Sequence, residues 1–216
     1  MPDMPEVLFL PGWGASGGVY RDGLPAGWTL LSPPDFGKSG GHLDYYLAWL
    51  LGDLEARQRP VVLAGHSMGA ALAVRAAVRA PGSVERLVLV GPAGLRLTKP
   101  IAISAAQFVM QVMDGRLPRA DAFLSVRDVV LAPVSALRLA LEVRSLDLTH
   151  EMTTIRQRGM PVTVIGCTTD TLVTPRHCRS VARLLGARYR EVRLDGGHMW
   201  MLGRGDRLGL ELNAAL

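Results

Sequence analysis

Hydrophobic residues gather in short runs of strand length along the chain, and longer amphipathic stretches separate these runs. The pattern predicts six strands, at residues 6–10, 28–31, 61–64, 87–90, 162–165 and 189–194. The first, third, fourth and fifth runs are almost continuously apolar, which is typical of parallel strands buried on both faces of a sheet. The last run alternates apolar and polar residues, so we expect it to form an edge strand.

Amphipathic segments between the strands predict helices, at residues 43–57, 68–79, 175–185 and 206–216. Thr174 followed by Pro175 is typical of a helix start, with an N-cap and a proline at the first helical position. Strands that alternate with helices indicate an α/β fold. We therefore predict a mostly parallel, six-stranded sheet with helices on both faces.

The alternation is interrupted once, between residues 95 and 158. This stretch has an amphipathic helical pattern that is cut by prolines, and it contains no convincing strand. We divide the chain into a core of residues 1–94 and 159–216 and a helical cap subdomain of residues 95–158. Insertions of this size tend to carry function. The apolar, methionine-containing segment 101–113 either roofs an acyl site or packs on the core, and the pattern leaves both open.

A candidate nucleophile lies directly after the third predicted strand. Residues 65–69 have the sequence GHSMG, a G-x-S-x-G pattern that passes into an alanine-rich helix. Such a turn forces the serine into a strained backbone conformation, and the glycines leave room for it. Strand before and helix after are the context of a nucleophile elbow, and the helix N-terminus adds a partial positive charge. We predict that Ser67 is the nucleophile.

A serine nucleophile needs a base, and the base needs a carboxylate that orients it. Asp170 follows the fifth strand and His198 follows the sixth, so both are expected at the sheet edge that carries Ser67. The order serine, aspartate, histidine is the one that accompanies this elbow. Asp195 is closer to the histidine in sequence and is the alternative acid, but it terminates the strand, so we favour Asp170.

The other histidines have weaker contexts. His66 is expected to be a packing residue, and His42 a helix-start residue. His150 lies in the insertion, and His177 lies within a helix. We predict that His198 is the general base.

The oxyanion of acyl transfer needs two backbone N–H donors. We assign one to Met68, the residue after the nucleophile, and the other to Trp13 in the loop after the first strand. The alternative for this loop is that Gly12 and Gly14 only make a turn.

These features occur in the order found in the α/β-hydrolase superfamily, which the chain resembles over nearly its whole length. They are the loop PGWG at 11–14, the segment PDFGKS at 34–39, the elbow GHSMG, and the paired Asp170 and His198. The loop also resembles that of the pimeloyl carrier-protein methyl ester esterases, which share a tryptophan there and a helical cap. This closer resemblance implies an acyl carrier protein as a partner, for which arginines 116, 119 and 127 would be contacts.

Two features depart from the family pattern. Pro11 stands where a histidine often precedes the glycine of the oxyanion loop. The usual first two of eight strands are not expected here, which predicts a minimal six-stranded sheet. Ser67 also disfavours the haloalkane dehalogenase branch, whose nucleophile is an aspartate.

Composition narrows the class of protein. With 216 residues, 49% of them hydrophobic, the chain is one ordinary globular domain. No apolar stretch reaches 18 residues, because prolines and charges interrupt the richest region, 129–143, so no membrane-spanning helix is expected. The net charge is +5, but the arginines are scattered and aromatic residues make up only 6%. Nucleic acid is therefore not an expected partner.

Cys167 and Cys178 are the only cysteines, and residues 1–6 contain two acidic and no basic side chains. Both facts favour a cytoplasmic protein. The cysteines do not form a zinc spacing with His177, so we expect no metal and no cofactor. The oligomer is expected to be a monomer or a homodimer.

The sequence thus predicts a serine hydrolase that cleaves a carboxylic ester or thioester through an acyl-enzyme. An acyltransferase or a carbon–carbon bond hydrolase that uses the same triad remains an alternative. A hydrolase-like binding protein with little turnover is a third.

Overall fold

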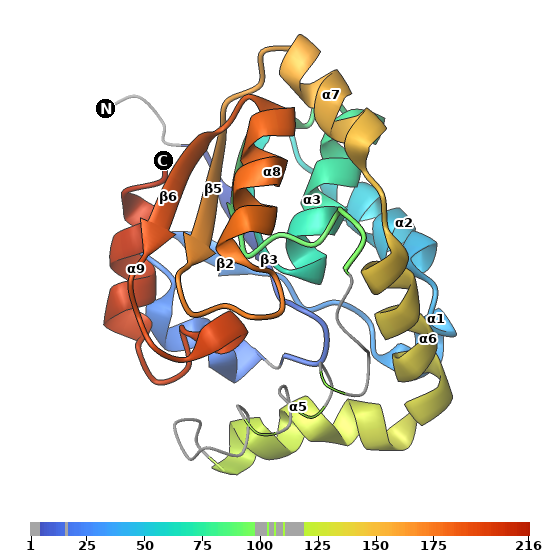
Figure 1. Ribbon diagram of the computed structural model, residues 1–216. Coiled ribbons are helices and arrows are strands. Elements are labelled where there is room, and N and C mark those ends of the chain that lie inside the picture. The colour runs from blue at the N-terminus through green and yellow to red at the C-terminus, as the bar shows by residue number, and fades with distance from the viewer. Residues whose placement is uncertain (1–4, 16, 98–102, 104–105, 107–109, 111–118) are drawn as a thin grey trace.

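The computed structural model describes residues 5–15, 17–97, 103, 106, 110 and 119–216. Within them lies a six-stranded sheet of order β2-β1-β3-β4-β5-β6, in which every pairing is parallel (Figure 1). The strands are β1 (Val7–Leu10), β2 (Trp28–Leu30), β3 (Val61–His66), β4 (Val84–Val90), β5 (Val162–Cys167) and β6 (Arg188–Val192). All six predicted strands are confirmed, and β6 is an edge strand as its alternating pattern predicts.

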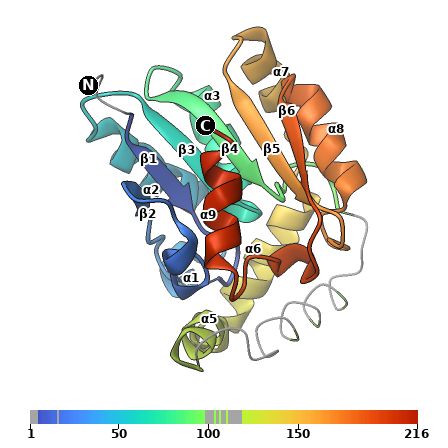
Figure 2. The same ribbon diagram turned by 90° about the vertical axis from the view of Figure 1, so that its left-hand side faces the viewer.

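Helices cover both faces of the sheet, as expected. The described α-helices are α1 (Phe36–Ser39), α2 (Leu43–Glu55), α3 (Met68–Arg79), α5 (Arg119–Leu131), α6 (Pro133–Ser145), α7 (Thr149–Gln157), α8 (Pro175–Leu185) and α9 (Gly205–Asn213). Figure 2 shows α9 in front of the sheet, with α2, α3 and α8 behind it. None of the helices in the described residues is long and apolar enough to cross a membrane.

Alternate residues of each central strand enter two separate cores. Leu8 and Leu63 pack with the side chains of α2, α3, α7 and α8. Phe9 and Val62 pack on the opposite face, with α9 and the segment around Trp200. Every residue of β1, β3 and β5 is buried, because both faces are covered. This two-sided burial explains the continuous apolar runs in the sequence.

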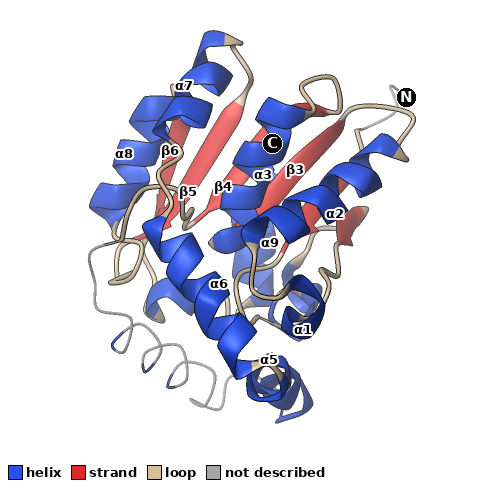
Figure 3. Ribbon diagram, turned by 90° about the vertical axis from the view of Figure 1, so that its right-hand side faces the viewer, coloured by secondary structure: helices blue, strands red, loops and turns tan. Residues whose placement is uncertain are grey.

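The helices of the insertion lie in two places. α5 and α6 lie beyond the carboxyl ends of the strands (Figures 1 and 3), where α5 contacts α1 and α6 contacts α1 and α2. By contrast, α7 packs on α3 and α8, and its Met152 and Ile155 belong to the main core. The division into a core and a cap of residues 95–158 stays a prediction, and most of segment 101–113 lies outside the described residues.

Candidate active site

Ser67 lies at a sharp turn between β3 and α3. Its backbone has φ 54° and ψ −112°, and among the described residues no other non-glycine residue has a positive φ. Three backbone hydrogen bonds hold this conformation: its N–H donates to Val90 O (2.9 Å), and its carbonyl accepts from Ala71 N and Ala93 N (3.2 Å each). A strained backbone that its surroundings enforce is typical of functional sites.

The turn is possible only because glycines flank it. A Cβ at Gly65 would lie 2.5 Å from the backbone of Gly69, and a Cβ at Gly69 would lie 2.4 Å from the carbonyl oxygen of Leu10. Any other residue at either position would push α3 away from the ends of β1 and β3. The pattern G-x-S-x-G is therefore a packing requirement of this turn.

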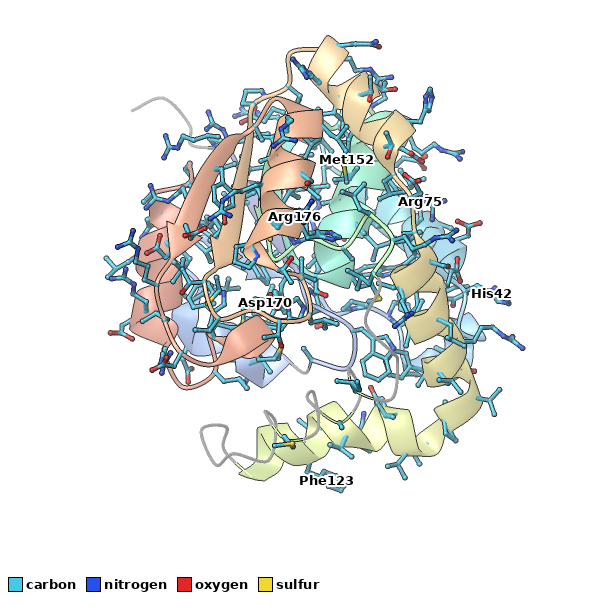
Figure 4. All side chains as sticks on the ribbon, in the orientation of Figure 1. His42, Arg75, Phe123, Met152, Asp170 and Arg176 are labelled. Carbon is cyan, nitrogen blue, oxygen red and sulfur yellow. The ribbon has the colours of Figure 1, made fainter. Side chains whose placement is uncertain are left out.

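His198 and Asp170 come together from neighbouring loops. His198 lies in a short 3-10 helix (Gly197–Met199) after β6, and Asp170 lies in the loop between β5 and α8 (Figure 4). Nδ1 of His198 is 2.7 Å from Oδ2 of Asp170. The other carboxylate oxygen accepts from the backbone N–H groups of Leu172 (2.8 Å) and Val173 (2.9 Å), which fix its orientation. The alternative acid, Asp195, is exposed and does not occupy this position.

Thr169 joins the two loops. Its hydroxyl donates to Leu194 O (2.6 Å) and accepts from Gly197 N (3.2 Å). Thr169, which precedes Asp170, therefore links the Asp170 loop to Leu194 and Gly197, at the two ends of the turn before His198. Sequence reasoning missed this role, because a threonine in a loop carries no pattern of its own.

The second ring nitrogen of His198 points to no partner. Nε2 is buried and has no hydrogen-bond partner in the part of the chain that the structure describes. The ring lies close to Gly91, where a Cβ would be 3.2 Å from its Cε1. Gly91 follows Val90, whose carbonyl holds the N–H of Ser67. Ser67, Asp170 and His198 thus gather around the end of β4, at one edge of the sheet.

The two predicted oxyanion donors come from different elements: Met68 is the first residue of α3, and Trp13 lies in the loop after β1. Met68 begins α3, so its N–H is one of the first-turn amides that have no carbonyl partner within the helix. Trp13 is anchored through its ring: the indole Nε1 donates to Ala136 O of α6 (3.0 Å), and the ring stacks on Phe36 at 5.6 Å between centroids. The assignment of the Trp13 and Met68 amides to the oxyanion hole stays a prediction.

His66 is buried, as expected of a packing residue, but its ring also lies against the ring of His198. Its side chain is 1% exposed and its ring lies 4.6 Å from that of His198, with a tilt of 36°. Burial, followed by the nearby charge of His198, lowers the pKa of His66 well below its usual value.

The remaining histidines lie elsewhere. His42 and His150 are exposed, and Figure 4 shows His42 directed away from the molecule. His177 is in the first turn of α8, and burial lowers its pKa. Among the described residues, no group of three or more His, Cys, Asp or Glu side chains could hold a metal ion.

A cavity of about 240 Å³ lies beside the site, between the loop after β1, the loop after β2 and α5. Gly12 and Met68 line it, together with the apolar side chains of Leu31, Phe36 and Leu124. Arg127 and Asp128 of α5, which form an ion pair (2.9 Å), also line it. It therefore adjoins Met68, one predicted oxyanion donor, and the glycines on either side of Trp13, the other, and it has the apolar lining that an acyl group needs.

A family model and several known proteins resemble this chain. A curated relative from Methylococcus capsulatus, a pimeloyl-[acyl-carrier protein] methyl ester esterase, is 38% identical over 93 residues. The match covers 39% of this chain and 36% of that relative, so it spans about a third of the relative's length.

Solved structures match over nearly the whole chain. A hydrolase from Oleispira antarctica has a TM-score of 0.75 and 15% identity, with 98% of this chain and 90% of that chain covered. The enol-lactonase from Burkholderia xenovorans LB400 has a TM-score of 0.66 and 20% identity, with 98% and 91% covered. At these identities the likeness shows a common fold.

The family model is that of the alpha/beta hydrolase family, and it matches residues 7–208, from β1 into α9. The match includes the elbow at Ser67 and the loops of Asp170 and His198. The resemblance expected from the motifs is confirmed, and the chain belongs to the alpha/beta hydrolase family.

Proposed function

We propose that the protein is a serine hydrolase that cleaves a carboxylic ester or thioester through an acyl-enzyme. One observation carries this proposal: Nδ1 of His198 meets Asp170 at 2.7 Å, while Nε2 is left without a partner among the described residues. An imidazole that a carboxylate orients through one nitrogen, and whose other nitrogen has no partner, is suited to accept the proton of a serine hydroxyl.

In the first half-reaction, Oγ of Ser67 attacks the acyl carbon while Nε2 of His198 takes its proton. Asp170 accepts the hydrogen bond of Nδ1–H, which fixes the tautomer and stabilises the imidazolium. The N–H groups of Met68 and Trp13 stabilise the tetrahedral oxyanion. His198 then gives its proton to the leaving oxygen or sulfur, and the alcohol or thiol departs.

In the second half-reaction, water replaces the leaving group. His198 takes a proton from the water as its oxygen attacks the ester carbonyl of the acyl-enzyme. The tetrahedral intermediate collapses, the Ser67 oxygen receives the proton from His198, and the carboxylic acid is released. No step requires an oxidant, a reductant or a further co-reactant.

We assign the acyl group to the 240 Å³ cavity, because Met68 and the glycines that flank Trp13 line it and because it has apolar walls. Ligand pockets for larger molecules run from about 300 Å³ upwards. A medium-length or aromatic acyl chain is the size class that fits. A panel of nitrophenyl esters of increasing chain length should show a maximum in kcat/KM followed by a decline. Indifference to acyl length would refute the acyl assignment without affecting the triad.

An acyl carrier protein is the proposed partner, supported by the name of the relative that matches part of the chain. Arg127 on α5 is half-exposed but already paired with Asp128. Arg116 lies outside the described residues, as does the side chain of Arg119. Activity on carrier-bound and free esters of one acyl group should differ, and Arg127→Ala should reduce the difference. Equal activity on both substrates would refute the proposal that an acyl carrier protein is a partner.

The central test is labelling by a fluorophosphonate probe. Wild type should label and Ser67→Ala should not, whereas the control Ser180→Ala, which alters a serine on α8, should label like wild type. Failure of wild type to label, or ester hydrolysis by Ser67→Ala at the parent rate, would refute the proposal. Transfer of the acyl group to an added alcohol in preference to water would favour the acyltransferase.

We include a cytoplasmic location in the proposal. Cys167 and Cys178 are both free and buried. Burial raises the pKa of the Cys178 thiol, which keeps it protonated and unreactive at neutral pH. Localisation of a tagged chain in a cell of the source organism would test this part.

A further inference from the structure

A chain of hydrogen bonds runs beneath the site, from the loop after β1 to the loop after β6. Gly12 N donates to the hydroxyl of Tyr20 (3.0 Å), and this hydroxyl lies 2.8 Å from Nδ1 of His66. Nε2 of His66 lies 3.2 Å from the carbonyl oxygen of His198. Tyr20 is 0% and His66 1% exposed, so water does not compete for these bonds.

The chemistry of the partners assigns each proton. The His198 carbonyl can only accept, so Nε2 of His66 must carry the hydrogen. In a neutral imidazole Nδ1 is then an acceptor, so the Tyr20 hydroxyl donates to it. The same hydroxyl oxygen accepts from the Gly12 amide. Every group in the chain of bonds is satisfied with His66 neutral and in the Nε2–H form.

The surroundings favour this protonation state. Burial, with the charge of His198 next, lowers the pKa of His66, which keeps the ring neutral. Burial also raises the pKa of Tyr20, so its hydroxyl keeps the proton that it donates. A neutral ring beside His198 does not oppose the charge that His198 gains when it takes a proton from Ser67.

The distances leave little freedom. A Cβ at Gly12 would lie 2.8 Å from Nδ1 of His66 and 3.3 Å from the Tyr20 hydroxyl. The oxyanion loop is thus seated directly on the Tyr20–His66 pair, and Trp13, the predicted donor, is the next residue. The other end of the pair holds the backbone of His198 itself.

We propose that Tyr20 and His66 are positioning residues that hold the oxyanion loop and the His198 loop in a single catalytic geometry. This inference rests on the serine hydrolase function proposed above. Neither side chain is placed at the reacting atoms: Tyr20 acts through the backbone of Gly12, the residue before the predicted donor Trp13, and His66 acts through the carbonyl of His198. Misplacement of a reacting group by about 1 Å can cost on the order of a hundredfold in rate.

The variant Tyr20→Phe tests the pair, because it removes the Gly12 acceptor and the His66 donor but keeps the ring. We expect kcat to fall about tenfold to a hundredfold with little change in KM, since transition-state geometry is lost rather than substrate binding. Phe9→Leu is the matched control: Phe9 packs on the Tyr20 ring at 5.0 Å between centroids and makes no side-chain hydrogen bond. It should lower stability and leave kcat near the wild-type value.

Substitutions at His66 separate the two halves of the pair. The amide nitrogen of His66→Gln can replace Nε2–H as donor to the His198 carbonyl, so this variant should retain more of kcat than His66→Leu, which has no polar group. Equal kcat in these two variants would show that the bond to His198 has no positioning role.

The imidazole ¹⁵N shifts of His66 give a readout that is independent of turnover. They should show the neutral Nε2–H tautomer at neutral pH, and a charged ring there would overturn the proton assignment. If wild type hydrolyses esters and folded Tyr20→Phe keeps full kcat, the positioning role is refuted and the hydrolase stands. If wild type has no turnover and does not label, the proposed function itself fails.

Discussion

Replacement of Asp170 by asparagine should greatly lower kcat without unfolding the protein, because of the hydrogen bonds that hold the carboxylate. Its Oδ1 accepts from Leu172 N (2.8 Å) and Val173 N (2.9 Å), so an oxygen must face those two donors. The amide NH₂ of Asp170→Asn is then turned toward Nδ1 of His198, 2.7 Å from the replaced Oδ2. Two donors face each other unless Nδ1 gives up its hydrogen.

The size of the effect follows from the tautomer. With Nδ1 bare, the neutral imidazole carries its proton on Nε2, the nitrogen that has to accept the proton of Ser67. Loss of this kind in a serine triad lowers kcat about 10⁴-fold, which corresponds to about 5.5 kcal/mol of transition-state stabilisation. Stability should fall by only about 1–2 kcal/mol, because the two backbone bonds become neutral but remain.

The assay is kcat on a nitrophenyl ester, with urea unfolding measured on the same preparations. Asp195→Asn is the matched control, since Asp195 is exposed and lies in the adjoining loop. It should keep kcat within about twofold, as a surface substitution usually does. Near-parental kcat in Asp170→Asn, or an equal loss in Asp195→Asn, would refute the assignment of the acid.

Three further perturbations have defined outcomes. Gly69→Ala places a Cβ 2.4 Å from Leu10 O and should cost about 1–3 kcal/mol in urea unfolding; Gly82→Ala, where nothing lies within 4 Å, should not. Trp13→Phe removes the bond to Ala136 O and should cost about 1 kcal/mol, with altered acyl-length selectivity in the ester panel; unchanged selectivity would argue against the anchor. The folded-state pKa of His66 lies below its unfolded value, so unfolded chains bind the proton first, and stability should decline as pH falls below about 6.5. His66→Gln should flatten this decline in unfolding measured across pH, and an unchanged slope would assign it to other groups.

Strand boundaries illustrate how far a sequence pattern reaches. The apolar run 87–90 predicted β4, but the strand begins at Val84. The pattern missed this start because Glu85, which is exposed, and Arg86, which is half-buried, are polar. β5 likewise continues to Cys167 rather than ending at residue 165, since its last residues pair with β6. Polar or small residues at strand ends conceal the pairing that extends a strand.

The histidines illustrate a second limit. The hydrophobic pattern shows which residues follow the ends of strands. From chain order alone it predicted Ser67, Asp170 and His198 at the carboxyl edge of the sheet. It could not find the role of His66, whose partners are 46 and 132 residues away in sequence. Hydrogen bonds across such separations depend on the fold, and a single buried histidine in a strand has the same local pattern whether or not it makes them.

By itself, the sequence determined the order of strands and helices, the family and the residues at the carboxyl edge of the sheet. These follow from hydrophobic periodicity and from glycines that a tight turn requires, both of which are local. Only the tertiary structure decided that Asp170 rather than Asp195 meets His198, that α7 packs on α3 and α8, and that Tyr20 and His66 join two loops. Each depends on directions and distances between segments far apart in the chain, which burial and backbone hydrogen bonds establish on folding.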